Sequence, residues 1–155
     1  MKRFLKIEVG ALLVLILAIT TVAFAQSPFV GTWKLNLDKS KFIGAAPLEW
    51  IDVIREAEED QFEVNTKIVL PENVIINEVL VWSRQGGVAK YLQGGPEGAM
   101  DVITTISPNE WILTRIVDGK QIGWMNFLVS PNGKAIRYIL KVPGLIEGEV
   151  VFDKQ

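Results

Sequence analysis

The sequence contains neither cysteine nor histidine. Without cysteine there is no disulfide framework and no lipid-attachment residue, so an exported domain of this kind depends on its apolar core for stability. Without histidine the chain lacks the commonest general base and the commonest transition-metal ligand. Zinc sites built from these two residue types, Ser-His-Asp triads and Cys-His pairs are therefore excluded. We expect a protein that is not an enzyme and that holds no metal and no cofactor.

The chain also lacks a large excess of either charge, because its formal net charge at pH 7 is only −2. Proteins that bind nucleic acid or anionic lipid carry a clear surplus of lysine and arginine. We therefore expect no nucleic-acid partner. The sequence has no internal repeat, no low-complexity tract and no linker between domains, which indicates a single domain.

One long apolar run is present, and it lies at the N-terminus. It is preceded by the basic residues Lys2, Arg3 and Lys6 and followed by Ala23-Phe24-Ala25, the small residues that a signal peptidase reads. We expect a signal helix over residues 1–25, cleavage before Gln26, and a periplasmic or secreted bacterial domain over residues 26–155. The alternative is an uncleaved anchor, but the run is shorter than the roughly 20 apolar residues of a spanning helix. Cleavage would leave no stable membrane anchor.

The rest of the chain consists of short runs of alternating apolar and polar residues, separated by turn residues. The expected strands are 29–37, 49–58, 61–70, 74–83, 88–92, 100–106, 110–117, 120–130, 134–142 and 148–154. Such a series is too long for a flat open sheet, and closing the sheet removes its exposed edges. The sequence therefore predicts an all-β fold, an antiparallel up-and-down meander closed into a single barrel of about 8–10 strands, wide enough to be filled by side chains or to hold one small ligand.

Turn sequences predict which side chains face the interior, because paired residues of an antiparallel ladder share a face. Asp118-Gly119 is typical of a two-residue type I′ turn, and Pro71-Glu72-Asn73 closes a hairpin that pairs Leu70 with Val74. In the loop after Ser130 we expect that residue to pair with Lys134. The predicted inner face of the three late strands is Trp111, Leu113, Arg115, Ile122, Trp124, Asn126, Leu128, Ile136, Tyr138 and Leu140. That of the early hairpin is Phe62, Val64, Thr66, Ile68, Ile76, Glu78, Leu80 and Trp82.

The turn at Glu59-Asp60 leaves two registers open. A two-residue loop directs inward Ile51, Val53 and Arg55. A slip of one residue directs inward Trp50, Asp52 and Ile54 instead. We prefer the first.

Several motifs of the mature chain resemble a family of small exported bacterial proteins that are lipocalin-like and belong with the calycins. These motifs are Gly31-Thr32-Trp33-Lys34-Leu35-Asn36, Asp38-Lys39-Ser40-Lys41-Phe42, Val129-Ser130-Pro131-Asn132-Gly133-Lys134 and Val151-Phe152-Asp153-Lys154-Gln155. The resemblance implies a lipocalin-like barrel with Trp33 at its closed end, beneath a basic residue of a late strand that the sequence does not identify. Members of this family largely have no assigned activity, so the resemblance implies a fold more than a ligand-carrying role.

Six polar side chains are predicted to point into the barrel: Arg55, Thr66, Glu78, Arg115, Asn126 and Tyr138. With Trp111 and Trp124 they form the candidate ligand-binding interior. They are either the few polar anchors of an apolar pocket or an internal network in which buried charges find partners. An Arg115–Glu78 or Arg55–Glu78 pair would satisfy the network. The tryptophans likewise either line a cavity or fill the core.

Three other segments have both a functional and a structural interpretation. The glycine-rich residues 84–98 form either a mobile lip at the barrel mouth or an irregular connection. The loop 38–48 either caps the mouth with Phe42, Ile43 and Leu48, which we slightly prefer, or packs outside. The acidic residues of 56–63 fit a solvated turn better than a calcium site or an acid–base pair.

We expect an exported, non-enzymatic barrel that binds a small apolar or amphipathic molecule. The alternative is a solid-core interaction module, for example a homodimer, that acts through an outer surface containing Ile112, Ile116, Met125, Phe127 and Ile139. The pocket hypothesis depends on Trp111 and Trp124 pointing to the same side of the barrel wall.

Overall fold

The computed structural model describes residues 26–58, 60–142 and 146–155. The predicted signal helix lies outside the described residues. Within them, no helix is long and apolar enough to cross a membrane. Over these residues, twelve strands and two 3₁₀ turns follow one another: β1 (Gly31–Leu35), η1 (Leu37–Lys39), β2 (Lys41–Ile43), β3 (Glu49–Ala57), β4 (Gln61–Val69), η2 (Pro71–Asn73), β5 (Ile75–Ser83), β6 (Gly87–Val88), β7 (Lys90–Gln93), β8 (Ala99–Ser107), β9 (Glu110–Val117), β10 (Lys120–Val129), β11 (Ala135–Val142) and β12 (Ile146–Lys154).

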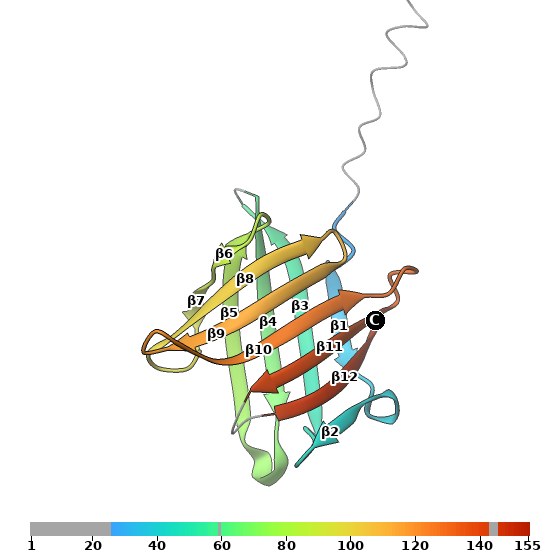
Figure 1. Ribbon diagram of the computed structural model, residues 1–155. Coiled ribbons are helices and arrows are strands. Elements are labelled where there is room, and N and C mark those ends of the chain that lie inside the picture. The colour runs from blue at the N-terminus through green and yellow to red at the C-terminus, as the bar shows by residue number, and fades with distance from the viewer. Residues whose placement is uncertain (1–25, 59, 143–145) are drawn as a thin grey trace, which may run out of the picture.

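The strands form one antiparallel meander that curls into a nearly closed barrel (Figure 1). The order of paired strands is β6-β8-β9-β10-β11-β12-β1-β3-β4-β5-β7. The first and last long strands of the chain are neighbours, because Trp33 of β1 lies opposite Lys154 of β12. The predicted all-β barrel is therefore confirmed. The structure differs from the predicted set of strands in two respects. It contains β2, which was not predicted, and the predicted strand 88–92 is divided into β6 and β7.

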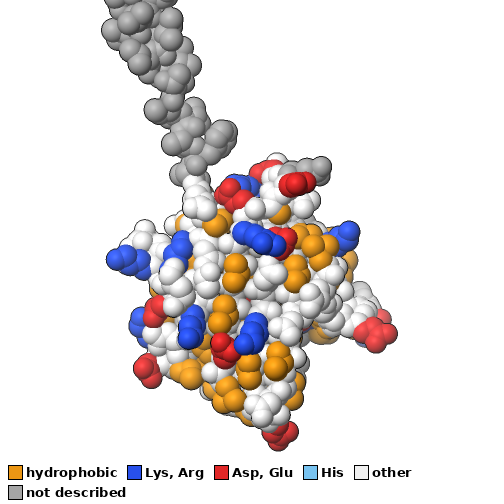
Figure 2. Space-filling view, turned by 180° about the vertical axis from the view of Figure 1, so that it is seen from behind, with side chains coloured by type: hydrophobic (Ala, Val, Ile, Leu, Met, Phe, Trp, Pro, Cys, Tyr) orange, Lys and Arg blue, Asp and Glu red, His pale blue; other side chains and the backbone are white. Residues whose placement is uncertain are grey.

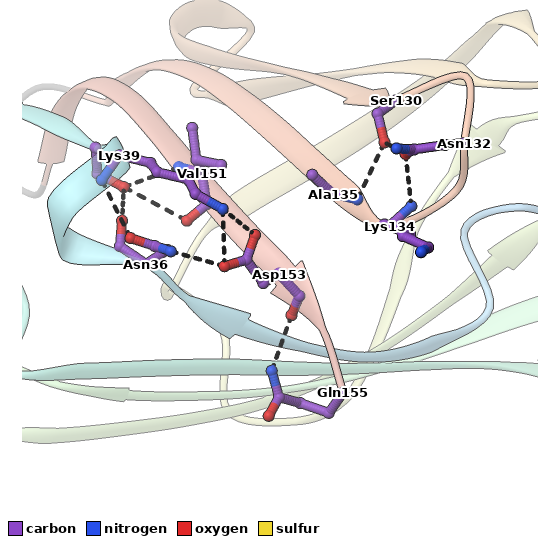
Figure 3. A network of polar contacts seen from close by, with 10 residues as sticks. Asn36, Lys39, Ser130, Asn132, Lys134, Ala135, Val151, Asp153 and Gln155 are labelled. Atoms are coloured by element: carbon purple, nitrogen blue, oxygen red, sulfur yellow. Dashed lines mark hydrogen bonds and ion pairs between the residues drawn. The ribbon is translucent and has the colours of Figure 1, made fainter.

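The loop after β1 extends the barrel wall and does not cap the mouth. The Asn36 amide donates to Asp153 at 2.7 Å, and the Lys39 ammonium pairs with the same carboxylate at 2.8 Å (Figure 3). The chain then turns into β2, which pairs with the first half of β12. The predicted cap is wrong, because Ile43 and Leu48 are 69% and 60% exposed, although Phe42 packs against the core.

The glycine-rich segment closes the barrel. Its residues in β6 pair with β8, and those in β7 pair with β5, so one short stretch of chain joins the two edges of the sheet. A Cβ atom on Gly86 would lie 2.6 Å from the Ile103 carbonyl oxygen, and one on Gly94 would lie 2.3 Å from that of Asn77. Only glycine allows the backbone to approach both edges this closely.

The inner face of β10 differs from the prediction because of a β-bulge. Val117 pairs with Lys120 as predicted, and Asp118 and Gly119 have the positive φ angles of a type I′ turn. The register then shifts between Gln121 and Gly123, so that Gly123 and not Ile122 lies opposite Arg115. Beyond the bulge, every side chain of β10 points to the face opposite to the predicted one.

The next hairpin is also one residue longer than predicted. Ser130 pairs with Ala135 rather than Lys134, because the Ser130 N–H donates to the Ala135 carbonyl at 2.8 Å. Asn132 accepts from the Lys134 N–H at 3.1 Å, and Ser130 Oγ accepts from the Ala135 N–H at 3.0 Å (Figure 3). The two one-residue shifts cancel at β11, whose inner residues Ile136, Tyr138 and Leu140 are the predicted ones.

The preferred register of β3 is wrong. Ala57 pairs with Gln61, which makes the loop one residue longer than predicted, and Asp60 has a φ angle of 61°. As a result Trp50, Asp52 and Ile54 are buried, the alternative that was not preferred.

Aromatic side chains fill one end of the barrel. The rings of Phe29 and Trp111 stack with centroids 3.5 Å apart, and Phe62 and Trp82 pack on Trp111 at 4.7 and 5.2 Å. Trp33 is fully buried beside them, and its indole N–H donates to the Phe29 carbonyl at 2.7 Å. The Lys154 ammonium lies 5.0 Å from the centroid of the Trp33 ring. This packing closes one end of the interior.

Seen from the side opposite to Figure 1, the outer wall shows apolar side chains interspersed with lysine and arginine (Figure 2).

Candidate functional site: the internal cavity

The barrel contains a partly open cavity of about 90 Å³. Its floor is formed by Trp82 and Trp111, and its walls are mostly aliphatic and aromatic side chains. A buried water needs roughly 10–15 Å³ of such space, so the cavity has room for several waters or a small molecule. It is smaller than the roughly 300–1,000 Å³ of drug-sized pockets. The site is therefore scaled to a compact ligand.

The structure brings five of the predicted interior residues to this cavity: Thr66, Glu78, Trp111, Arg115 and Tyr138. It excludes the other three. Arg55 is on the outer face, where it pairs with Glu63. Trp124 lies opposite Thr114 on the outside of the wall because of the bulge, and the Asn126 amide donates to Glu110 there at 2.8 Å. Trp111 and Trp124 thus point to opposite sides, contrary to the prediction.

The condition set for the pocket hypothesis therefore fails, but a cavity is present, because Met125 and Phe127 take the inward positions of β10 in place of Trp124 and Asn126. The same exchange removes both residues from the outer surface that the interaction-module hypothesis requires. The remaining members of that surface, Ile112, Ile116 and Ile139, are only partly exposed.

The first polar cluster of the cavity is centred on Arg115. Its guanidinium donates to both oxygens of Asp101, at 2.9 Å from Nε and 2.7 Å from Nη2. Nη2 also donates to the Tyr91 hydroxyl at 2.8 Å, and this hydroxyl donates to Asp101. The hydrogen bonds to Asp101 raise the pKa of Arg115 above its ordinary value, against the effect of burial. The predicted Arg115–Glu78 pair is therefore replaced by a bidentate pair with Asp101.

The second cluster is centred on Asp52, which is 3% exposed. Its Oδ1 accepts from Trp50 Nε1 at 3.0 Å and from the Thr66 hydroxyl at 2.7 Å, and its Oδ2 accepts from the Tyr138 hydroxyl at 2.6 Å. Burial raises the pKa of Asp52, and these hydrogen bonds act in the opposite direction, that of Tyr138 most strongly. Among the described residues no cation pairs with this carboxyl, so neutral donors alone stabilise it.

Glu78 lies opposite Thr66, as predicted, on the inner face of β5. Within the described part of the chain no side chain forms a hydrogen bond or an ion pair with its carboxyl. Burial raises the pKa of Glu78, the Arg115 charge lowers it, and the charges of Asp101 and Asp52 raise it again. The indole Nε1 of Trp82, further along the same face, is buried and also has no hydrogen-bond partner among these residues.

Sequence reasoning missed Asp52, Asp101 and Tyr91. Asp101 shares a face with Ile103 by simple alternation, but its place opposite Arg115 also depends on the register shift between Thr105 and Ser107, which alternation does not reveal. The inward orientation of Asp52 depended on a single residue in the length of the loop between β3 and β4. Tyr91 belongs to β7, too short a strand for its face to be read from alternation.

The acidic hairpin carries ion pairs. Arg84 pairs with Glu56 at 2.7 Å and with Asp60 at 3.0 Å, and its guanidinium lies 5.1 Å from the centroid of the Phe62 ring. Over the described residues, no group of three or more metal-binding side chains is arranged to hold an ion.

No protein-family model and no curated protein sequence matches this chain. Among solved structures, the wild-type fluorescent protein UnaG is similar, with a TM-score of 0.56, 14% sequence identity, and coverage of 82% of this chain and 97% of that one. Two point mutants of UnaG, each with one asparagine replaced, align with the same TM-score at 15% identity, covering 83% of this chain and 96% of theirs. At such low identity the likeness is one of fold alone, and it agrees with the antiparallel β-barrel described above.

Proposed function

We propose that this protein is an exported, non-enzymatic barrel that binds a small, largely apolar molecule in its internal cavity. The observation that carries the proposal is the cavity itself, which has aromatic and aliphatic walls and polar groups directed into it. The fold supports it, since barrels of this kind are wide enough to hold one small ligand. The absence of cysteine and histidine from the sequence supports the non-enzymatic part.

The size of the cavity sets the first probes. A hydrocarbon-lined cavity of about 150 Å³ holds benzene. This cavity is smaller but partly open, so we choose probes with a single ring, part of which can extend toward the opening. Toluene and benzyl alcohol are neutral probes of that size. Trp50, Trp82 and Trp111 line the cavity, so occupancy should change the intrinsic fluorescence as well as raise the melting temperature.

A matched pair of variants separates the cavity from the outer wall. Leu113 lines the cavity and its neighbour Thr114 faces outward. Leu113→Trp should fill the space and abolish the response to both probes, whereas Thr114→Trp should leave it unchanged. Circular dichroism of each variant verifies the fold. If neither probe binds the parent chain, the cavity is not a ligand site and the solid-core module becomes the better hypothesis.

Export is tested separately. Expression of the full chain in a Gram-negative bacterium should yield a periplasmic protein whose N-terminal sequence starts at Gln26. Recovery of the uncleaved chain in the membrane fraction would support an anchor instead.

A further inference from the structure

The charges that face the cavity are unbalanced. One guanidinium, that of Arg115, shares the interior with three carboxyl groups, those of Asp52, Asp101 and Glu78. Each belongs to a different strand, so the barrel itself brings them together. In a poorly hydrated interior this imbalance acts strongly on any charged ligand.

Most of the guanidinium is already committed within the protein. Its Nε and Nη2 donors bind both oxygens of Asp101 and the Tyr91 hydroxyl, at 2.7 to 2.9 Å. A ligand carboxylate that bound these donors would have to displace Asp101 and leave that buried carboxylate without a partner, which is strongly unfavourable. Arg115 thus neutralises an acid of the protein, and only its Nη1 donors remain for an acidic ligand.

Asp52 is also engaged within the protein, because it accepts three hydrogen bonds from Trp50, Thr66 and Tyr138. Glu78 is the remaining acid, partly buried at the cavity wall and without a hydrogen bond or ion pair from the described residues. On the same face of β5, the buried Trp82 N–H also lacks a partner among them. Two polar groups on one strand are therefore uncommitted, one of them an acid at the cavity wall and the other at the aromatic floor.

We infer that the cavity selects a small apolar amine, whose ammonium group pairs with the Glu78 carboxylate while its ring or alkyl body lies toward Trp82 and Trp111. This inference rests on the proposed binding function and specifies its ligand class. Carboxylates are disfavoured, since they would add a negative charge beside the acids already present. A charge-assisted hydrogen bond to Glu78 gives the amine its advantage over a neutral ligand of equal size.

Three probes with the same ring test the inference: benzylamine, benzyl alcohol and benzoate. Calorimetric titration at about pH 8, well above the ordinary pKa of a carboxyl group, favours the ionised form of Glu78. We expect benzylamine to bind at least about tenfold more tightly than benzoate, with benzyl alcohol between them. Glu78→Gln should remove most of the preference for benzylamine over benzyl alcohol. Glu72→Gln, the same charge change in the exposed turn of η2, should have no effect.

The outcomes distinguish the two proposals. If benzyl alcohol binds but benzoate binds as well as benzylamine, the amine inference is overturned and the binding function stands. If benzylamine is preferred and Glu78→Gln leaves this preference intact, the anchor is wrongly assigned and the inference also fails. If none of the three binds, the binding function itself is lost. The comparison of probes on the unmodified chain remains decisive even where a variant folds poorly.

Discussion

Two aspartates are buried in the same barrel, and the protein stabilises them in different ways. Asp101 is paired with a guanidinium and a phenol, whereas Asp52 receives only neutral donors. The ion pair gives Asp101 a compensating charge but requires its cation to remain in place. Neutral hydrogen bonds do not fully offset the cost of removing the Asp52 charge from water, and burial therefore raises the pKa of Asp52. The comparison predicts that the first cluster is sensitive to loss of its partner and the second to pH.

The largest effect should come from Arg115→Met. This change leaves Asp101 buried without its cation, and breaking a buried pair in this way costs about 3–5 kcal/mol of unfolding free energy. Denaturant titration measures the loss. Arg55→Met, which breaks the exposed pair with Glu63, should cost no more than about 1 kcal/mol. Equal losses in the two variants would show that Asp101 does not depend on its cation.

A smaller effect is expected for Tyr138→Phe, which removes the only donor to Asp52 Oδ2 among the described residues. An unsatisfied buried acceptor costs roughly 1–3 kcal/mol. Tyr91→Phe is the matched change in the other cluster, where Asp101 retains both bonds from Arg115. It should cost less, about 0.5–1.5 kcal/mol. The reverse order would contradict the account of Asp52.

The third prediction concerns the sign of a pH effect. Because the pKa of Asp52 is higher in the folded state than its ordinary value of 3.8, the folded chain holds this proton longer, and stability falls as pH rises between the two values. Asp52→Asn should remove this loss. The unfolding free energy of the variant should therefore rise relative to that of the parent as pH rises, by at most about 1.4 kcal/mol per pH unit.

Asp153 supplies a control of opposite sign. The hydrogen bond from Lys39 and that from Asn36 lower its pKa. The contribution of Asp153 to stability is present above its unfolded pKa and is lost as pH falls. The unfolding free energy of Asp153→Asn should therefore fall relative to that of the parent as pH rises. Denaturation curves between about pH 3 and pH 7 measure both differences. Parallel behaviour of the two variants would refute the contrast.

The smallest effect should come from Glu78→Gln. Since no described residue pairs with this carboxyl and burial raises its pKa, neutralising it removes an unfavourable charge. The unfolding free energy should stay within about 0.5 kcal/mol or increase. A clear loss of stability in the same denaturant titration would mean that Glu78 is part of a structural network.

Alternation and turn chemistry were enough to predict the barrel and the inner faces of β4, β5, β9 and β11. Where a turn had an unambiguous sequence, as at Asp118-Gly119, it placed Trp111 and Arg115 correctly. The errors have one physical origin, the two-residue period of a strand, which converts a single extra residue into a reversed face. The bulge at Ile122 and the longer loop at Asp60 each add such a residue.

These errors affected the site more than the fold. The barrel closes whether Trp124 or Met125 points inward. The cavity, however, contains the carboxyl of Asp52 only because the register of β3 directs Asp52 inward and Arg55 outward. Loop length is decided by hydrogen bonds such as that from Ala135 to Ser130, which form only once the hairpin has folded. Residue type alone does not reveal them.

The segment that joins the two edges of the sheet is held by few ladder pairs, two between β6 and β8 and three between β5 and β7. Regions with few contacts open at free energies well below that of global unfolding. We expect the amide protons of this stretch to exchange with deuterium before those of the long strands. Detachment of this segment would open the barrel wall laterally. The release rate of a bound molecule would then depend on this lateral opening rather than on the open end of the barrel.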